Sequence, residues 1–186
     1  PNDKGIRSSK HFESIAKKVK TFKSIPEAIA KSNMVIATSV RRRDLSIPLI
    51  NFEDIEKLDS KKITILFGQE NNGLSNKEIS YANYILTIPT QKNKSLNLSH
   101  SVALVAYMLS RPTSVSEEKI FQNGLKSEET EKFISYLMQL LKNRRFTTIK
   151  AKAENLELTL RSFIKSTNID QKMLKTAYGI IKFLTK

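Results

Sequence analysis

The sequence predicts an α/β fold built on a parallel sheet and followed by a small all-helical unit, and three observations support this class. Short apolar or β-branched runs at 34–38, 63–67 and 84–90 alternate with helical segments, which is the order that a parallel sheet requires. The run 63–67 leads through a glycine loop into a helix, an arrangement found where open sheets bind ligands. After residue 117 no convincing strand follows, and three amphipathic stretches take its place.

Composition limits the classes of protein to consider. The 186 residues, 39% of them hydrophobic, suffice for one domain or for one domain with a small appendage. Cysteine is absent and there are two histidines, so we expect neither disulfides nor a metal centre. Without a run of about eighteen apolar residues or a signal-peptide pattern, we expect no membrane association and a cytoplasmic location.

The charge balance favours a polyanionic partner. Lysine and arginine total 32 against 18 acidic residues, a formal net charge of +14, and such an excess promotes binding to nucleic acid through counterion release. A proteome that is generally rich in lysine would give the same surplus without any such partner.

The first part of the chain is basic and then becomes helical. The basic segment 3–23 fits either a loop or helix that faces RNA or a solvated surface segment. Ser24 as a cap, Pro26 in the first turn and Glu27 at the capping-box spacing predict a helix that runs to about residue 32.

The middle of the chain is predicted to alternate strands and helices. In chain order we expect a strand at 34–38, a long loop at 39–50, a short helix at 51–58 capped by Asn51, strands at 63–67 and 84–90, and a helix at 97–111. The unbroken run 63–67 fits a strand buried on both faces. Gly68 and Gly73 permit backbone angles or a close approach that a Cβ would forbid. Ser75 and Glu78 predict a capping box that opens the next helix.

Three motifs carry a resemblance to a known family. FGQENNGLS at 67–75, IPT at 88–90 and SLNLS at 95–99 resemble motifs two and three of the SPOUT, or SpoU/TrmH-type, RNA ribose 2′-O-methyltransferases. The stretch ATSVRRRD at 37–44 resembles more narrowly the TrmJ branch, which modifies the tRNA anticodon loop. The resemblance covers residues 1 to about 111 well and the helical tail more loosely.

The resemblance implies a fold and an assembly. It implies a SPOUT methyltransferase domain at 1–111 with a C-terminal trefoil knot, and a homodimer that forms through the knot region. Pro112 and the small hydroxyl residues after it interrupt helix, so we expect a linker at 112–126 and a helical tRNA-binding domain at 127–186. Its helices are predicted at 128–141, 150–165 and 170–184.

The resemblance also implies a binding site for S-adenosylmethionine, made of three loops at the carboxyl ends of neighbouring strands. Carried over by motif, the cofactor-binding residues are Thr38, Ser39, Val40, Gly68, Ile88, Ser95, Leu96 and Asn97. Glu70 matches the family's acidic position, and we expect it to orient loops or substrate rather than to abstract a proton. For Ser95 and Asn97, plain helix capping is the alternative, and both interpretations can hold together.

Two groups of basic residues are predicted to contact RNA. Arg41, Arg42 and Arg43 lie in one loop, where adjacent guanidiniums repel one another unless anions such as phosphate neutralise them. A solvent-exposed charge run with a salt bridge to Asp44 is the alternative. In the helical tail, the basic residues expected to form a tRNA-binding side are Lys142, Arg144, Arg145, Lys150, Lys152, Arg161 and Lys165.

No catalytic residue is assigned within the printed sequence. The family uses an arginine of motif one to assist loss of the ribose hydroxyl proton, and we expect that segment to lie upstream of Pro1. The predicted function is an S-adenosylmethionine-dependent tRNA ribose 2′-O-methyltransferase that acts on the pyrimidine at anticodon-loop nucleotide 32. Two alternatives stay open: an rRNA 2′-O-methyltransferase, since motifs two and three do not choose the RNA, and a non-catalytic RNA-binding protein on a SPOUT scaffold.

Overall fold

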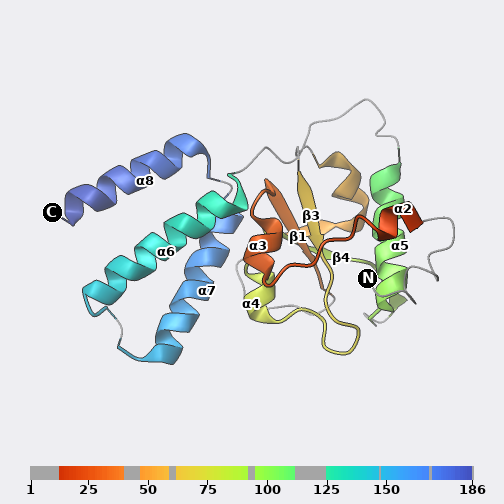
Figure 1. Cartoon of the computed structure of the whole chain (residues 1–186), viewed down its shortest axis with the longest axis horizontal. Coiled ribbons are helices and arrows are strands. Elements are labelled where there is room, and N and C mark those ends of the chain that lie inside the picture. The colour runs from red at the N-terminus through yellow and green to blue at the C-terminus, as the bar shows by residue number, and fades with distance from the viewer. Residues whose placement is uncertain are drawn as a thin grey trace.

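A computed structural model of the chain shows a sheet with its helices beside a separate group of helices near the C-terminus (Figure 1). The structure describes residues 13–39, 47–58, 62–91, 95–111, 125–146, 148–167 and 169–185. Among these residues, no helix is both long and apolar enough to cross a membrane.

The sheet has four strands in the order β2-β4-β1-β3, and every neighbouring pair is parallel. The strands are β1 (Met34–Thr38), β2 (Leu49–Asn51), β3 (Ile63–Leu66) and β4 (Tyr84–Thr87). The parallel α/β class and the three predicted strands are therefore confirmed. The prediction of a continuous loop at 39–50 was wrong at its end, because β2 begins there; three residues are too few for an apolar pattern to be recognised.

The helices α2 (Glu13–Ala16) and α3 (Ile25–Ile29) precede β1, and the longer α5 (Leu98–Ser110) follows β4. Between the strands lie the 3₁₀ helix η2 (Phe52–Lys57), which connects β2 to β3, and α4 (Asn76–Ile79), which connects β3 to β4. The predicted Ser24 cap and the Ser75–Glu78 capping box are both present. Two details differ from the sequence expectation. Helix α3 ends at Ile29, earlier than predicted, and Asn51 makes no side-chain cap, because its amide instead donates to Asp54 at 3.0 Å.

Alternate residues of the central strand β1 face two separate apolar layers. Val35 and Ala37 pack in a cluster with residues of α3 and α4, whereas Met34 and Ile36 pack with residues of η2 and α5. The period of two along a strand places these side chains on opposite faces. Strand β3 was expected to be buried on both faces, but all four of its residues are half-buried, because β3 lies at the edge of the sheet.

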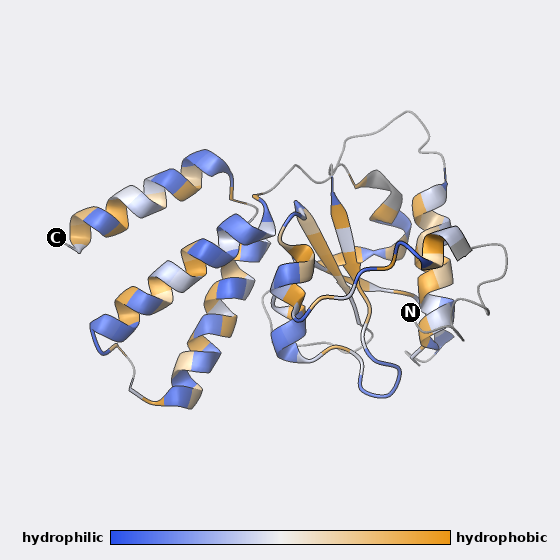
Figure 2. Cartoon of the chain, viewed as in Figure 1, coloured by the Kyte–Doolittle hydropathy of each residue, from blue (hydrophilic) through white to orange (hydrophobic). Residues whose placement is uncertain are grey.

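The remaining helices are α6 (Ser127–Asn143), α7 (Lys150–Ser166) and α8 (Gln171–Leu184), which confirms the three predicted helices. Apolar and polar residues alternate along them (Figure 2). Their apolar sides form one cluster around Phe133, Ile134, Ile164 and Leu174. The division into domains at 1–111 and 127–186, with a linker between them, stays a prediction.

The three helices are joined to the sheet part by a buried polar junction. The first amides of α6 donate to the chain after α3, from Ser127 to the Ser32 carbonyl at 2.9 Å and from Glu128 to the Ala30 carbonyl at 3.2 Å. These bonds satisfy amides that a helix start leaves without intrahelical partners. Buried Asn83 accepts from the Val35 amide at 2.9 Å and donates to the Lys165 carbonyl at 3.1 Å, so it joins β1 to α7.

Two cations expected on the tRNA-binding side lie inside this junction instead. The exposed fractions of Arg161 and Lys165 are 3% and 2%. Arg161 pairs with Glu131 at 3.1 Å and with Glu157 at 2.5 Å, and it lies 4.5 Å from the centroid of the Tyr81 ring. The prediction that these two cations face RNA was therefore wrong, because partners from both parts of the molecule cover them. The other five cations of that set are exposed.

Candidate functional site

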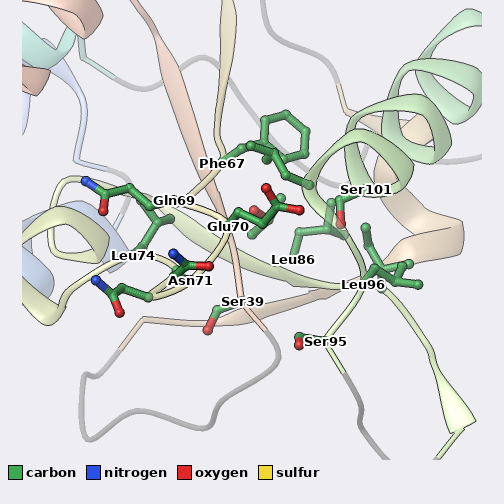
Figure 3. Close-up of a pocket in the computed structure, with 16 residues that line it drawn as sticks. Ser39, Phe67, Gln69, Glu70, Asn71, Leu74, Leu86, Ser95, Leu96 and Ser101 are labelled. Carbon is green, nitrogen blue, oxygen red and sulfur yellow. The ribbon is translucent and has the colours of Figure 1, made fainter.

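A pocket of about 160 Å³ lies at the edge of the sheet where β1, β3 and β4 end. Four segments line it: the end of β1, the loop after β3, the end of β4, and the segment that leads into α5 with the first turn of that helix (Figure 3). The residues that line it are Thr38, Ser39, Phe67, Gly68, Gln69, Glu70, Asn71, Asn72, Gly73, Leu74, Leu86, Ile88, Ser95, Leu96, Leu98 and Ser101. The carboxyl ends of parallel strands thus bring distant parts of the sequence to one place.

Hydrogen bonds between strand ends fix the base of the pocket. The Thr38 hydroxyl donates to the Leu66 carbonyl at 3.0 Å, which links β1 to β3. The Ser39 amide donates to the Leu86 carbonyl at 3.0 Å, and the Thr87 hydroxyl donates to the Ser39 carbonyl at the same distance. The side chain of Thr38 and the backbone of Ser39 therefore hold the strand ends together as well as lining the pocket.

The loop after β3 folds back onto its own first glycine. A Cβ added at Gly68 would lie 2.2 Å from the carbonyl carbon of Gly73 and 2.4 Å from the Leu74 nitrogen, so no larger residue fits unless the backbone moves. Gly73 has a φ of 64°, in the left-handed region that glycine tolerates. Its amide donates to the Gln69 carbonyl at 2.8 Å and closes the loop. Both glycines are thus required by the loop's own backbone.

Glu70 and Asn97 connect this loop to the start of α5. The Asn97 amide donates to the Glu70 carboxylate at 2.6 Å, while the Asn97 side-chain oxygen accepts from the Ser99 backbone at 2.9 Å. Asn97 therefore caps the helix and anchors the loop with one side chain, so the capping interpretation holds for this residue. Glu70 thus contacts the start of α5, and its role in orienting loops or substrate stays a prediction.

The structure brings together most of the predicted cofactor-binding residues. Those that line the pocket are Thr38, Ser39, Gly68, Ile88, Ser95 and Leu96. Asn97 does not line it, but it binds Glu70, which does. Val40 and the three arginines Arg41, Arg42 and Arg43 lie outside the residues that the structure describes.

Sequence reasoning missed several lining residues. Phe67 and Leu86 belong to the ends of apolar runs, and Leu98 and Ser101 begin a helix, so their patterns predict core and helix positions rather than a pocket. Asn71 and Asn72 were quoted as part of a motif without any assigned role. Their place between the two conformationally required glycines was the available signal.

The pocket combines an apolar base with a polar rim. Phe67, Leu86, Ile88 and Leu96 supply apolar surface, whereas Ser39, Gln69, Glu70 and Ser95 supply hydroxyl, amide and carboxylate groups. Such a lining suits a ligand with a flat apolar end and a charged end. A nucleoside joined to an amino-acid chain has both, so the residues present fit S-adenosylmethionine.

Fold and pocket together define an α/β protein of the SPOUT methyltransferase type. The crystal structure of TrmJ from Z. mobilis ZM4 superposes with a TM-score of 0.85 at 25% identity, covering 100% of this chain and 82% of that one. A probable methylase family protein from Haemophilus influenzae gives a TM-score of 0.55 at 29% identity, with the same coverage. The chain belongs to the SpoU rRNA Methylase family, whose model matches residues 2–107.

Curated relatives agree with this assignment. The chain is 28% identical over 174 residues to the tRNA (cytidine/uridine-2′-O-)-methyltransferase TrmJ of Photorhabdus laumondii, covering 88% of this chain and 72% of that protein. It is 35% identical over 113 residues to the tRNA (cytidine-2′-O-)-methyltransferase TrmJ of Methanocaldococcus jannaschii, covering 57% of this chain and 49% of that protein. The chain thus spans about half the length of the archaeal relative. The expected class, an RNA 2′-O-methyltransferase, is confirmed.

Proposed function

We propose that the protein is an S-adenosylmethionine-dependent tRNA ribose 2′-O-methyltransferase that acts in the cytoplasm on the pyrimidine at anticodon-loop nucleotide 32. One observation carries the proposal: in a chain of this family, the segments beginning at Thr38, Phe67 and Ser95 line a single pocket. The likeness to a TrmJ structure along the whole chain and the TrmJ names of the relatives favour tRNA.

The chain's own residues provide binding and orientation. Phe67, Ile88 and Leu96 would pack against the flat faces of the adenine ring, and the hydroxyls of Ser39 and Ser95 would meet polar groups of the cofactor. When bound, S-adenosylmethionine supplies the methyl group. The bond between Glu70 and Asn97 keeps the loop against the start of α5, which limits the positions available to the bound ligands. Arg41, Arg42 and Arg43 are proposed to contact tRNA phosphates.

A homodimer with a trefoil knot completes the proposal. Helix α5 buries Val105 and Met108 against the sheet, while its other sides expose apolar residues, namely Val102, Leu104, Tyr107 and Leu109, at 39 to 65%. A second copy packed on this surface would remove it from water. The contact between the loop after β3 and the start of α5 is in keeping with a knot in this region.

Binding of S-adenosylhomocysteine tests the site directly. We expect calorimetry of the full-length gene product to show binding, and we expect Gly68→Ala to weaken it at least about tenfold, since backbone atoms occupy the space of the new Cβ. Gly179→Ala is the matched control, because nothing lies within 4 Å of its Cβ position. Equal affinity of the two variants, with both folded by circular dichroism, would contradict the assignment of the pocket.

The RNA substrate requires a separate experiment. Deleting the gene should remove one 2′-O-methylated pyrimidine from the tRNA fraction, as measured by mass spectrometry of nucleosides. Loss of a 2′-O-methylated nucleoside from rRNA alone would favour the second candidate, an rRNA methyltransferase, which the description of the matching family supports. An unchanged nucleoside set in both fractions would favour a non-catalytic RNA-binding protein.

A further inference from the structure

A groove lies at the turn between α6 and α7, at the end of this helix pair that points away from the sheet (Figure 1). It has a volume of about 520 Å³, and its lining includes Arg145, Phe146 and Ile149 from the turn and Lys152, Asn155 and Thr159 from α7. The methyltransferase pocket is built from other elements, so this groove is a separate feature.

An exposed aromatic ring occupies the rim of the groove. Phe146 is 67% exposed, although hydrogen bonds hold the backbone of Arg145 and Phe146 against the end of α6. Its amide donates to the Leu141 carbonyl at 2.9 Å and the Arg145 amide donates to the Lys142 carbonyl at 3.0 Å. These two bonds form a Schellman motif, in which a residue at the Phe146 position commonly packs back onto its helix. Here most of the ring faces solvent instead.

Arg145 holds the backbone conformation that glycine normally takes in this motif. Its φ is 54°, the left-handed region. The backbone at this position favours glycine, yet the chain has a positively charged side chain here, next in sequence to the exposed ring of Phe146.

The charged residues that line the groove, Arg145 and Lys152, are both cations. From 141 to 153 the sequence contains five cations and no acid, namely Lys142, Arg144, Arg145, Lys150 and Lys152, and all five are exposed. The first acid beyond this segment is Glu154. Surface cations around an exposed aromatic ring match the two parts of a nucleotide, its phosphate and its base.

We propose that this groove binds an unpaired nucleotide of the RNA substrate, with the base stacked on Phe146 and phosphates beside Arg145 and Lys152. The proposal rests on the proposed function, since it takes RNA as the substrate, and it adds a contact to a nucleotide other than the one that is methylated. Stacking on an aromatic ring tolerates any base, so the groove recognises an unstacked nucleotide rather than a sequence.

Binding of fluorescein-labelled tRNA, measured by anisotropy at fixed salt, tests the proposal with four full-length proteins. Phe146→Ala should weaken binding about tenfold, the effect of losing one stacked base. Phe146→Trp should stay within about twofold of the unchanged protein. Phe183→Ala is the matched control, because Phe183 is 79% exposed on α8, outside the groove.

A cross-link locates the contact independently of affinity. With tRNA that contains 4-thiouridine, irradiation should join RNA to the peptide that carries Phe146, and mass spectrometry should find much less of this product for Phe146→Ala. The cofactor pocket is far from this change in sequence, so binding of S-adenosylhomocysteine should be unaltered, which shows that the variant is folded.

The outcomes separate this proposal from the function on which it rests. If the unchanged protein neither binds nor methylates tRNA, the proposed function fails. If it does both, while Phe146→Ala and Phe183→Ala bind tRNA equally well and the cross-link is absent, the groove proposal is overturned and the function stands. If Phe146→Ala instead changes the mass measured by sedimentation, the ring belongs to an interface between copies, which also overturns the proposal.

Discussion

The two ends of α7 carry the same kinds of residue in opposite environments. Lys150 and Lys152 lie in its first turn and are exposed, whereas Arg161 and Lys165 lie in its last turns and are buried. The difference follows from what each end contacts. The first turn adjoins the turn from α6 at the outer end of the helix pair, while the last turns meet Tyr81, Asn83 and Ser127 at the junction.

The buried cations keep the helices joined to the sheet part. A buried charge is tolerated when it is paired and hydrogen-bonded, and Arg161 has two carboxylates and an aromatic ring around it. Burial lowers the pKa of the Arg161 side chain, but the Glu131 and Glu157 carboxylates outweigh this effect and raise it. Arg161 therefore remains charged and acts as a structural residue. The charge of the exposed cations, in contrast, is accessible from solvent.

The largest expected effect is a difference in the free energy of unfolding between substitutions at the two ends of α7. Arg161→Met leaves Glu131 without its cation partner and removes the contact with Tyr81, so we expect the free energy of unfolding to fall by about 3 kcal/mol. Lys152→Met, on the same helix, should change it by less than about 0.5 kcal/mol. Urea unfolding followed by circular dichroism measures both. A similar loss for the two variants would show that the contrast between the ends is wrong.

A second prediction concerns Lys165 and pH. Burial lowers the pKa of its ammonium group to about 8, from 10.5. Between these values the unfolded chain binds more protons than the folded chain at this residue, so the contribution of Lys165 to the free energy of unfolding rises with pH. This contribution is constant below about pH 8, and its full rise between about pH 8 and the unfolded value amounts to about 3 kcal/mol.

Urea unfolding at pH 7.5, 8.5 and 9.5 measures this rise, and Lys165→Met should remove it. The comparison stops short of pH 10 because burial raises the pKa of Tyr81, which opposes the effect at higher pH. Lys152→Met should keep the slope of the unchanged protein, since that side chain is exposed. A slope that survives Lys165→Met would assign the titration to another group.

The fold was predictable from the sequence where a local pattern decides the structure. The short apolar runs that form β1, β3 and β4 predict strands directly. The caps at Ser24 and Ser75 are equally local, because each depends on a pair of residues three positions apart. The pocket was predictable in part because its motifs follow strand ends. Of its apolar base, Ile88 and Leu96 were predicted from the motifs, but Phe67 and Leu86 were not, since these two look like ordinary core residues until the segments meet.

The role of each cation depended on tertiary contacts that charge patterns do not contain. Along α7, Lys150 and Lys165 both occupy positions that suit a solvated face, and no local feature marks Lys165 as buried. Its environment comes from Ser127 and Asn83, which lie 38 and 82 residues away in the sequence. Such contacts form only when the helices dock on the sheet part.

The smallest expected effect tests the exposed end, where stability and binding should change in opposite directions. Arg145→Gly removes the strain of a left-handed backbone at a residue with a Cβ, so it should raise the free energy of unfolding by about 0.5 to 1 kcal/mol. The same change should lower tRNA affinity and reduce the salt dependence of binding by about one phosphate contact.

Arg144→Gly is the matched control, because the φ of Arg144 is −89°. It removes the same charge without relieving strain, so it should lower stability. If Arg145→Gly gained stability at unchanged tRNA affinity and salt dependence, the cation beside Phe146 would have no part in RNA binding. Opposite signs for stability and affinity are expected only where a residue is retained for its charge despite an unfavourable backbone.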